Sequence, residues 1–462
     1  MKKRFVFLIM LCTFYATAFS QKLQYSRDQI KDPVGDALQL VTNVGGFHHL
    51  VSYETKRKPA IYVFNAQLQF VTKKELGVTL NENCDINITA FKNHYIIYFH
   101  VPGRSIHQLF RVNSDGSVKD ISMLISKPAD ALWNRSIATF QLFNIKEELF
   151  ILSHTYYDAI KKISSIVVKL NSESRPVVIN EFLLPFDRDE EELKQVSLDG
   201  DHLLILKTSK NAENGNSLGL FKINLSTKHT MSKYFESGKH VYMSPTFHFN
   251  LQDSSVIVYS MLTEPVGYIK KEPAVLISRL GDSLQELAPT TILRSQFKDK
   301  ASSNFMLINE SGETWINLAI TNNYRRTGDN LVINDPDVAA SYANNYIKPT
   351  DIRFSLLNKD LKLINDSLVK NNGNYYSIDL SPFAQFRLKS IPYLLLIQNF
   401  TSNKKGLLLI RPGDNGTMVT SDINVNYRYN FLLRQLRVGE DQYFIMPYKY
   451  KGEIGLLKVN MK

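Results

Sequence analysis

Clusters of Lys, Arg and Tyr are the residues of this chain whose chemistry best suits ligand binding. Three consecutive cations stand at 56–58, and the arginine pair at 325–326 could hold a carboxylate or phosphate through parallel N–H donors. Tyrosines beside such cations add ring faces on which a ligand can stack. The expected ligand-binding set is Lys56, Arg57, Lys58, Arg104, Tyr156, Tyr157, Tyr268, Tyr324, Arg325, Arg326 and Tyr448. Tyr53, Lys449, Tyr450 and Lys451 belong to the same loops.

Catalytic motifs are absent from the sequence. It contains no HExxH, GxSxG, Walker loop or paired CxxC. His100, His107 and His154 would lie near one face of the fold, where three imidazoles could bind a metal, but a histidine at a strand end is more often a hydrogen-bonded polar residue. We therefore expect no metal and no cofactor. The sequence alone does not place carboxylates opposite one another, so an acid pair of the glycosidase type stays open.

The composition indicates a globular chain that begins with an export signal. It has 462 residues, of which 44% are hydrophobic and 21% charged, and this excludes a disordered or collagen-like protein. Three basic residues at 2–4 precede an apolar stretch and a small-residue exit, which predicts a Sec-type signal peptide over 1–20. No later segment is long and apolar enough for a membrane helix. We expect a soluble periplasmic or extracellular protein, whose mature form keeps only Cys84 and so has no internal disulfide.

Internal repetition is the strongest signal for the fold. A short apolar strand recurs eight times, beginning near residues 48, 94, 148, 201, 254, 313, 391 and 440. After each copy come a loop and a second strand of its own type, such as AIYVFN, LGLFKIN and IGLLKVN. A strand precedes the first type, and another follows the second type after a turn such as NSDGS at 113 or RLGDS at 279. Each unit is thus an antiparallel meander of strands A, B, C and D. Residues 188–195 could instead form one helical turn in a loop.

Four strands in each unit of about 40 to 50 residues resemble the β-propeller class. The resemblance covers nearly the whole chain after the leader, and no named propeller family matches the repeats. It implies an all-β fold with a single propeller domain over 21–462. The last unit stops after strand C, while the unpaired segment KLQYSRD precedes the first unit. We therefore expect the N-terminal strand to complete the last blade and close a ring of eight blades; seven blades with one unit set aside is the alternative.

The two faces of such a ring would differ in charge. The B–C loops are mostly basic, whereas the A–B turns are mostly acidic. A basic face rich in tyrosine would attract an anionic partner. We expect a non-catalytic binding or scaffold protein of the bacterial envelope, whose anionic ligand or protein partner is an acidic glycan or an acidic peptide. Nucleic acid is not expected for an exported chain, and lysines in solvated loops can also be without function.

The longest interruption, residues 322–349, lies between strands B and C of the sixth unit. Loops of this length are often functional. They can also simply pack over a neighbouring blade. This loop carries Tyr324, Arg325 and Arg326 of the expected set. The alternative function is an enzyme, a glycan hydrolase or lyase, with its site at the channel mouth under this loop.

Overall fold

The computed structural model describes part of the chain. The described segments are 22–31, 38–53, 58–80, 85–101, 106–122, 138–170, 176–209, 217–236, 240–250, 253–263, 274–294, 301–308, 314–321, 349–370, 383–389, 391–401, 404–413, 417–426, 428–439 and 443–461. The leader expected at 1–20 and all but one residue of the loop at 322–349 lie outside them. Within these segments, no helix combines the length and the apolar character that crossing a membrane requires.

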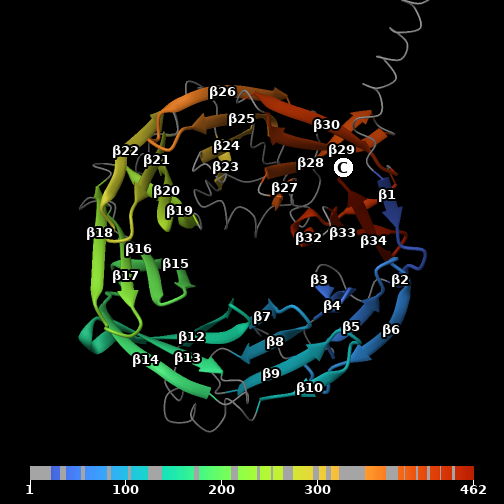
Figure 1. Cartoon of the computed structure of the whole chain (residues 1–462), viewed down its shortest axis with the longest axis horizontal. Coiled ribbons are helices and arrows are strands. Elements are labelled where there is room, and N and C mark those ends of the chain that lie inside the picture. Colours follow the sequence, from blue (N-terminus) through green and yellow to red (C-terminus); the bar gives the residue numbers. More distant parts are fainter. Residues whose placement is uncertain are drawn as a thin grey trace, which may run out of the picture.

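The described strands form seven four-stranded sheets and one six-stranded sheet, arranged around a ring (Figure 1). The four-stranded sheets contain β3 (Leu38–Val44), β4 (Phe47–Ser52), β5 (Ala60–Phe64) and β6 (Phe70–Glu75); β7 (Asp85–Ala90), β8 (His94–Val101), β9 (Ile106–Asn113) and β10 (Val118–Asp120); β11 (Ala138–Ile145), β12 (Glu148–Tyr157), β13 (Lys162–Leu170) and β14 (Pro176–Pro185); β15 (Glu191–Asp199), β16 (His202–Ser209), β17 (Ser217–Asn224) and β18 (Thr230–Glu236); β19 (Val241–Asn250), β20 (Ser255–Thr263), β21 (Ala274–Leu280) and β22 (Glu286–Arg294); β23 (Ala301–Ile308), β24 (Thr314–Thr321), β25 (Pro349–Leu357) and β26 (Leu363–Lys370); β27 (Phe383–Leu388), β28 (Ile391–Thr401), β29 (Lys404–Pro412) and β30 (Met418–Asn424). The six-stranded sheet contains β1 (Lys22–Tyr25), β2 (Ile30–Lys31), β31 (Asn430–Phe431), β32 (Arg437–Gly439), β33 (Tyr443–Tyr450) and β34 (Glu453–Asn460). Two short 3-10 turns are η1 (Asp158–Ile160) and η2 (Leu433–Gln435).

Each four-stranded sheet is a meander of consecutive antiparallel strands. Its first strand lies toward the centre of the ring and its fourth at the rim, as the labels β15 and β18 show (Figure 1). This confirms the predicted all-β propeller and the A–B–C–D order. Because successive strands alternate in direction, the B–C and D–A connections lie on one face of the ring, which we call the loop face. The A–B and C–D turns lie on the other, the turn face.

The N-terminal strand closes the ring, as predicted. β1 pairs antiparallel with β34, from Lys22 opposite Asn460 to Tyr25 opposite Leu457. β2 continues along the same partner, with Ile30 opposite Ile454. We call this six-stranded sheet the closing sheet, because in it the N-terminal strand β1 pairs with β34 and covers the edge that β34 would otherwise leave open.

Two local predictions from the sequence differ from the structure. The helical turn expected over 188–195 is confined to 188–190, where the Glu191 N–H donates to the Asp187 carbonyl at 2.6 Å. The expectation is wrong for 191–195, because β15 starts at Glu191 and its burial alternates with period two toward Val196 and Leu198. The expected first strand of the last unit is interrupted, since η2 separates β31 from β32. The interruption buries Leu433, and the side chain of Gln435 accepts a hydrogen bond from the Leu40 N–H in the neighbouring sheet at 3.3 Å.

The core lies between neighbouring sheets. The middle strands are buried along almost their whole length, because each sheet is covered on both faces by the next sheet of the ring. One cluster joins Leu152 of β12 to Leu203 and Ile205 of β16, two strands from adjacent sheets. The core is therefore a series of apolar layers, which explains why strands B and C are nearly continuously hydrophobic in the sequence.

The C–D turns repeat one backbone geometry. Leu68, Leu284 and Leu361 have φ near +59° and are almost fully buried, while Gly116 takes the equivalent place with φ +79°. A left-handed conformation is costly for leucine, so burial of its side chain must offset the backbone strain. In the β7–β10 sheet a side chain has no room at this place, because a Cβ on Gly116 would lie 2.7 Å from Val63 Cγ2.

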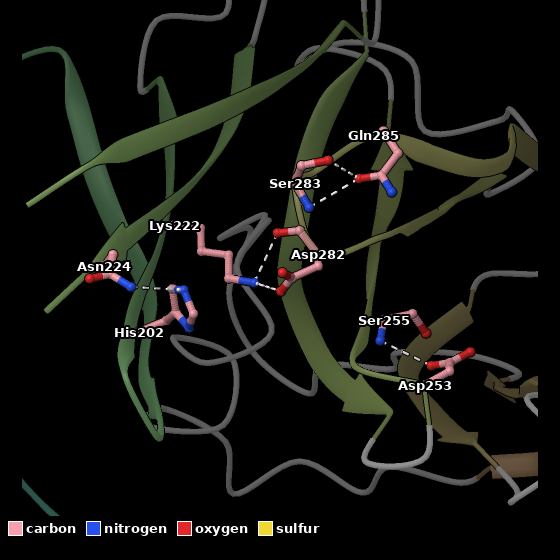
Figure 2. Close-up of polar contacts among 8 residues, drawn as sticks. All are labelled: His202, Lys222, Asn224, Asp253, Ser255, Asp282, Ser283 and Gln285. Carbon is pink, nitrogen blue, oxygen red and sulfur yellow. Dashed lines mark hydrogen bonds and ion pairs between the residues drawn. The ribbon is translucent and has the colours of Figure 1, made fainter. Parts of the chain in front are cut away.

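Side chains of one sheet also bind the turn backbone of the next. Five such contacts reach main-chain carbonyls in C–D turns: Gln24 to Gln67 (3.0 Å), His49 to Ser114 (2.9 Å), Asn180 to Leu225 (2.8 Å), Lys222 to Asp282 (2.9 Å) and Arg279 to Lys359 (2.7 Å). Figure 2 shows the Lys222 contact, where the ammonium group also pairs with the Asp282 carboxylate. These five contacts join adjacent sheets along the turn face, and we call them the belt.

Candidate functional site

Most of the expected ligand-binding residues lie outside the described segments. This applies to Lys56, Arg57, Arg104, Tyr268, Tyr324, Arg325 and Arg326. The described members are Lys58, Tyr156, Tyr157 and Tyr448. They come from three different sheets of the ring, so these four residues do not form one compact group.

Three acidic residues of the turn face pair with cations from strand C. Six sheets carry a Lys or Arg near the end of that strand, at 111, 169, 222, 279, 411 and 458. Lys169 pairs with Glu148 at 2.6 Å, and Arg279 pairs with Asp253. The side chain of Lys222 is only 3% exposed, whereas its partner Asp282 is 76% exposed. Contacts to these cations lower the pKa of the Asp282 carboxyl and contribute to lowering that of Asp253. The Lys222–Asp282 pair joins two sheets, whereas Lys169–Glu148 and Arg279–Asp253 each lie within one sheet. The charge pattern of the turns alone did not indicate these pairs.

The loop face near Tyr156 and Tyr157 is neutralised by its own acids. Lys161 pairs with Asp187 at 2.5 Å, and this contact lowers the pKa of the Asp187 carboxyl. Arg188 lies 5.4 Å from the ring centroid of Tyr156 and 3.9 Å from the Asp158 carboxylate. One level deeper, Lys207 pairs with Glu191 at 2.7 Å and donates to the Pro185 carbonyl. The basic character that we expected here is balanced by the loop that follows β14.

Tyr448 belongs to the core. Its side chain is 1% exposed, and its ring stacks on Tyr429 with centroids 4.3 Å apart. Gly455, opposite on β34, makes room for it, since a Cβ there would lie 2.4 Å from Tyr448 Cζ. The expected role of Tyr448 at the ligand surface thus gives way to a packing role. The neighbouring residue on the same side of β33 is Tyr450, which is partly exposed.

A group of basic and aromatic side chains surrounds Tyr450 on the loop face. Tyr429 lies beneath it, with ring centroids 5.2 Å apart, and Tyr25 approaches Tyr429 at 5.4 Å. The ammonium group of Lys451 lies 5.3 Å from the Tyr450 ring centroid. Arg428 precedes Tyr429 in the loop after β30 and is exposed. We call Tyr25, Arg428, Tyr429, Tyr450 and Lys451 the tyrosine cluster.

The electrostatic environment of the tyrosine cluster is positive. Hydrogen bonding to Arg428, with a smaller effect of Lys451, holds the pKa of the Tyr450 phenol below its usual value. Nearby cations that donate to the phenolate oxygen favour the anionic form of a surface phenol. Lys449 lies in the same hairpin, and Lys58 is exposed at the equivalent loop of the next sheet. The cluster therefore combines aromatic surface with several cations.

Local backbone geometry places these side chains. Lys451 and Gly452 both have positive φ, which gives a tight two-residue turn between β33 and β34. The side chain of Asn426 accepts the Arg428 N–H at 3.1 Å, and the Asn426 carbonyl accepts the Tyr429 N–H at 3.1 Å. The sequence analysis included Tyr450 and Lys451 among the loop residues but missed Tyr25, Arg428 and Tyr429. The signal available was NYRYNF at 426–431, where Arg and Tyr alternate directly before a strand.

Of the three histidines considered for a metal site, only His154 belongs to the residues whose side chains are described. No group of three or more His, Cys, Asp or Glu suited to a metal was found in that part of the chain. His154 is fully buried, and its Nδ1 lies 2.8 Å from Ser165 Oγ. The side chains of His100 and His107 lie outside the described set, although the two residues are paired in register on β8 and β9.

Comparison with known proteins gives neither a family nor an activity. Neither a scan against protein-family models nor a search of curated proteins finds a match. Among solved structures, a candidate 6-phosphogluconolactonase from Bacteroides fragilis is 12% identical over 86% of this chain and 98% of its own, with a TM-score of 0.36. A puromycin-hydrolyzing peptidase of Mycobacterium tuberculosis is 9% identical over 79% of this chain and 49% of its own, with a TM-score of 0.42.

A GH43 β-1,3-galactosidase is 9% identical over 57% of this chain and 55% of its own, with a TM-score of 0.26. This chain therefore spans about half the length of the peptidase and of the galactosidase. Likenesses at this level say nothing about what the chain binds. Its sheet topology and ring closure identify it as a β-propeller, without assignment to a named family.

Proposed function

We propose that this propeller is a non-catalytic binding or scaffold protein of the bacterial envelope, exported by its leader, and that it holds an anionic ligand or protein partner at the loop face. The observation that carries the proposal is the tyrosine cluster, where Arg428 and Lys451 flank the accessible ring of Tyr450. On the turn face, by contrast, Glu148 and Asp253 pair with strand-C cations of their own sheets. The proposal thus keeps the expected face and shifts its centre to the closing sheet.

We also infer that the ring has eight blades, with the closing sheet counted as the eighth beside the seven four-stranded sheets. Each of the eight repeats found in the sequence corresponds to one sheet. The closing sheet has the same meander of strands A, B and C, and its fourth strand comes from the N-terminus. The alternative of an enzyme at the channel mouth depends on residues 322–348, which lie outside the described part of the chain.

The test is binding of two polyanions of different chemistry, polygalacturonate and poly-glutamate, at about 0.02 M and about 0.5 M salt. We expect polygalacturonate to bind at low salt and to be released at high salt, because exposed charges are screened. Arg428→Glu with Lys451→Glu should weaken binding roughly tenfold, since each reversal replaces attraction by repulsion. Lys119→Glu, on the exposed outer strand β10, is the matched control.

The outcomes separate the possible partners. Binding of poly-glutamate alone would replace the glycan by an acidic peptide as the ligand class. Equal binding by the double variant and by the control would show that the site does not lie at the tyrosine cluster. Substitution of Lys56, Arg57 and Lys58 by Glu would then test the neighbouring loop. Salt-insensitive binding, or none to either polyanion, would refute the anionic-ligand function.

A further inference from the structure

The N-terminal segment is fixed to the closing sheet by more than strand pairing. The Ser26 N–H donates to the Leu456 carbonyl at 2.8 Å, and the Leu456 N–H donates back to Ser26 Oγ at 3.0 Å. At the start of β1, the Asn460 side chain donates to the Lys22 carbonyl at 3.2 Å. Ser26 is buried although it lies in an interruption between β1 and β2. The segment 22–31 is therefore bound to β34 at a defined position by side-chain as well as main-chain hydrogen bonds.

The same segment also binds the first four-stranded sheet. The side chain of Gln24 donates to the Gln67 carbonyl at 3.0 Å, and the carboxylate of Asp28 accepts the Phe70 N–H at 3.1 Å. Both partners belong to the β3–β6 sheet or its C–D turn. The segment thus joins the last sheet of the ring to the first, so its release would free one side of that junction.

Tyr25 connects this segment to the loop that presents the ligand-binding groups. Its hydroxyl accepts the Asn426 N–H at 3.3 Å, and Asn426 in turn holds the backbone of Arg428 and Tyr429. The ring of Tyr25 packs edge-on against Tyr429 at 5.4 Å. Nearby, the Gln29 side chain donates to the Tyr448 hydroxyl at 3.0 Å, which supports the ring beneath Tyr429.

From these contacts we propose that the N-terminal closing segment completes the anion site, so that anion binding and ring closure stabilise each other. This inference rests on the proposed function and adds its regulation. Tyr25 acts as a positioning residue, because it fixes the turn that carries Arg428 and Tyr429. Energetic coupling between two events is reciprocal, so a ligand bound at the cluster must hold the segment in place to the same degree as the segment favours the ligand.

The first experiment needs no ligand. In a double variant, Gln24→Ala removes the hydrogen bond from the Gln24 side chain to the Gln67 carbonyl, and Asn460→Ala removes the one from the Asn460 side chain to the Lys22 carbonyl. Neither bond involves a residue of the tyrosine cluster. Hydrogen exchange, read by mass spectrometry, should become roughly fivefold faster in residues 22–31 and also in 425–431. Asn180→Ala is the matched control, since it removes a bond of the same kind between two other sheets. Faster exchange in 22–31 alone would overturn the coupling.

The second experiment adds polygalacturonate to the full-length chain. We expect bound polymer to slow trypsin cleavage after the exposed Arg27 and Lys31, and we expect the Gln24→Ala/Asn460→Ala variant to bind the polymer several-fold more weakly than the Asn180→Ala control. Binding with unchanged cleavage and unchanged affinity would refute the coupling while the proposed function stands. If no polyanion binds, the proposed function fails, and the exchange experiment still decides whether the segment positions residues 425–431.

Discussion

Acidification between pH 7 and pH 5 should destabilise this protein through three buried histidines. His48, His49 and His154 lie on the second strands of their sheets and are at most 1% exposed. Burial lowers the pKa of each of them to about 4. At His48 the nearby charge of Lys458 adds to the effect. Neither ring nitrogen of His48 has a hydrogen-bond partner among the described residues, so a proton there would have nothing to stabilise it.

The direction follows from comparing folded and unfolded states. An unfolded histidine takes up a proton near pH 6.5, whereas these folded ones resist it until about pH 4. Their contribution to stability is therefore complete above pH 6.5 and is lost as the pH falls toward 4. Each histidine costs about 2 kcal/mol of unfolding free energy by pH 5 and about 3 kcal/mol by pH 4. Three of them together approach the total stability of an ordinary domain, about 5 to 15 kcal/mol.

The assay is urea unfolding at pH 7.5, 6 and 5, a range above the ordinary titration of carboxylates. We expect the free energy of unfolding to drop by several kcal/mol across it. His48→Phe, a buried ring without a titrating group, should remove about one third of that drop. His229→Phe is the control, because His229 is exposed on a C–D turn. A flat profile in the parent chain, or the same drop in His48→Phe, would show that these histidines are not the acid-sensitive groups.

Three further substitutions test the packing of the closing sheet and the belt. Gly455→Ala should cost about 1 to 3 kcal/mol, because the new Cβ would lie 2.4 Å from Tyr448 Cζ; Gly77→Ala, with nothing within 4 Å, should be neutral in the same thermal melt. Tyr448→Ala should cost about 3 to 5 kcal/mol in urea unfolding, and a smaller loss would contradict its burial. Asp282→Ala should cost about 1 to 2 kcal/mol, since it leaves the ammonium of Lys222 with only a carbonyl acceptor while the exposed carboxylate is partly screened; no loss at low salt would argue against the belt.

The sequence carried enough information for the fold because each sheet obeys the same local rule. Strands covered on both faces must be apolar throughout, so segments such as 203–206 and 443–446 are recognisable without any contact information. The closing strand was also predictable. The last unit lacks strand D, and the unpaired N-terminal strand can take that place and cover the open edge of the sheet. By contrast, the break at η2 depends on a hydrogen bond between the Gln435 side chain and the backbone N–H of Leu40 in another sheet. No sequence pattern near residue 435 predicts this contact.

The candidate site was less predictable because its members meet only through tertiary packing. Tyr448 and Tyr450 are equally tyrosine in the sequence, and both follow the same strand pattern. Their burial differs. Gly455 makes room for the Tyr448 ring and Tyr429 covers it, while the tight turn at 451–452 leaves Tyr450 at the surface. Tyr25 joins them from about four hundred residues away, through the ring closure itself.

The two faces of the ring are constrained to different degrees by this architecture. In the described part of the chain, five C–D turns meet a side chain from the preceding sheet, as Ser114, Leu225 and Lys359 do through their carbonyls, so the backbone position of these turns is fixed by assembly. Among the described residues, the loops on the opposite face show no contact of this kind that repeats from sheet to sheet. A binding site is therefore easier to accommodate on the loop face. The closing sheet is the most versatile place for it, because there alone the ring combines side chains from both ends of the chain.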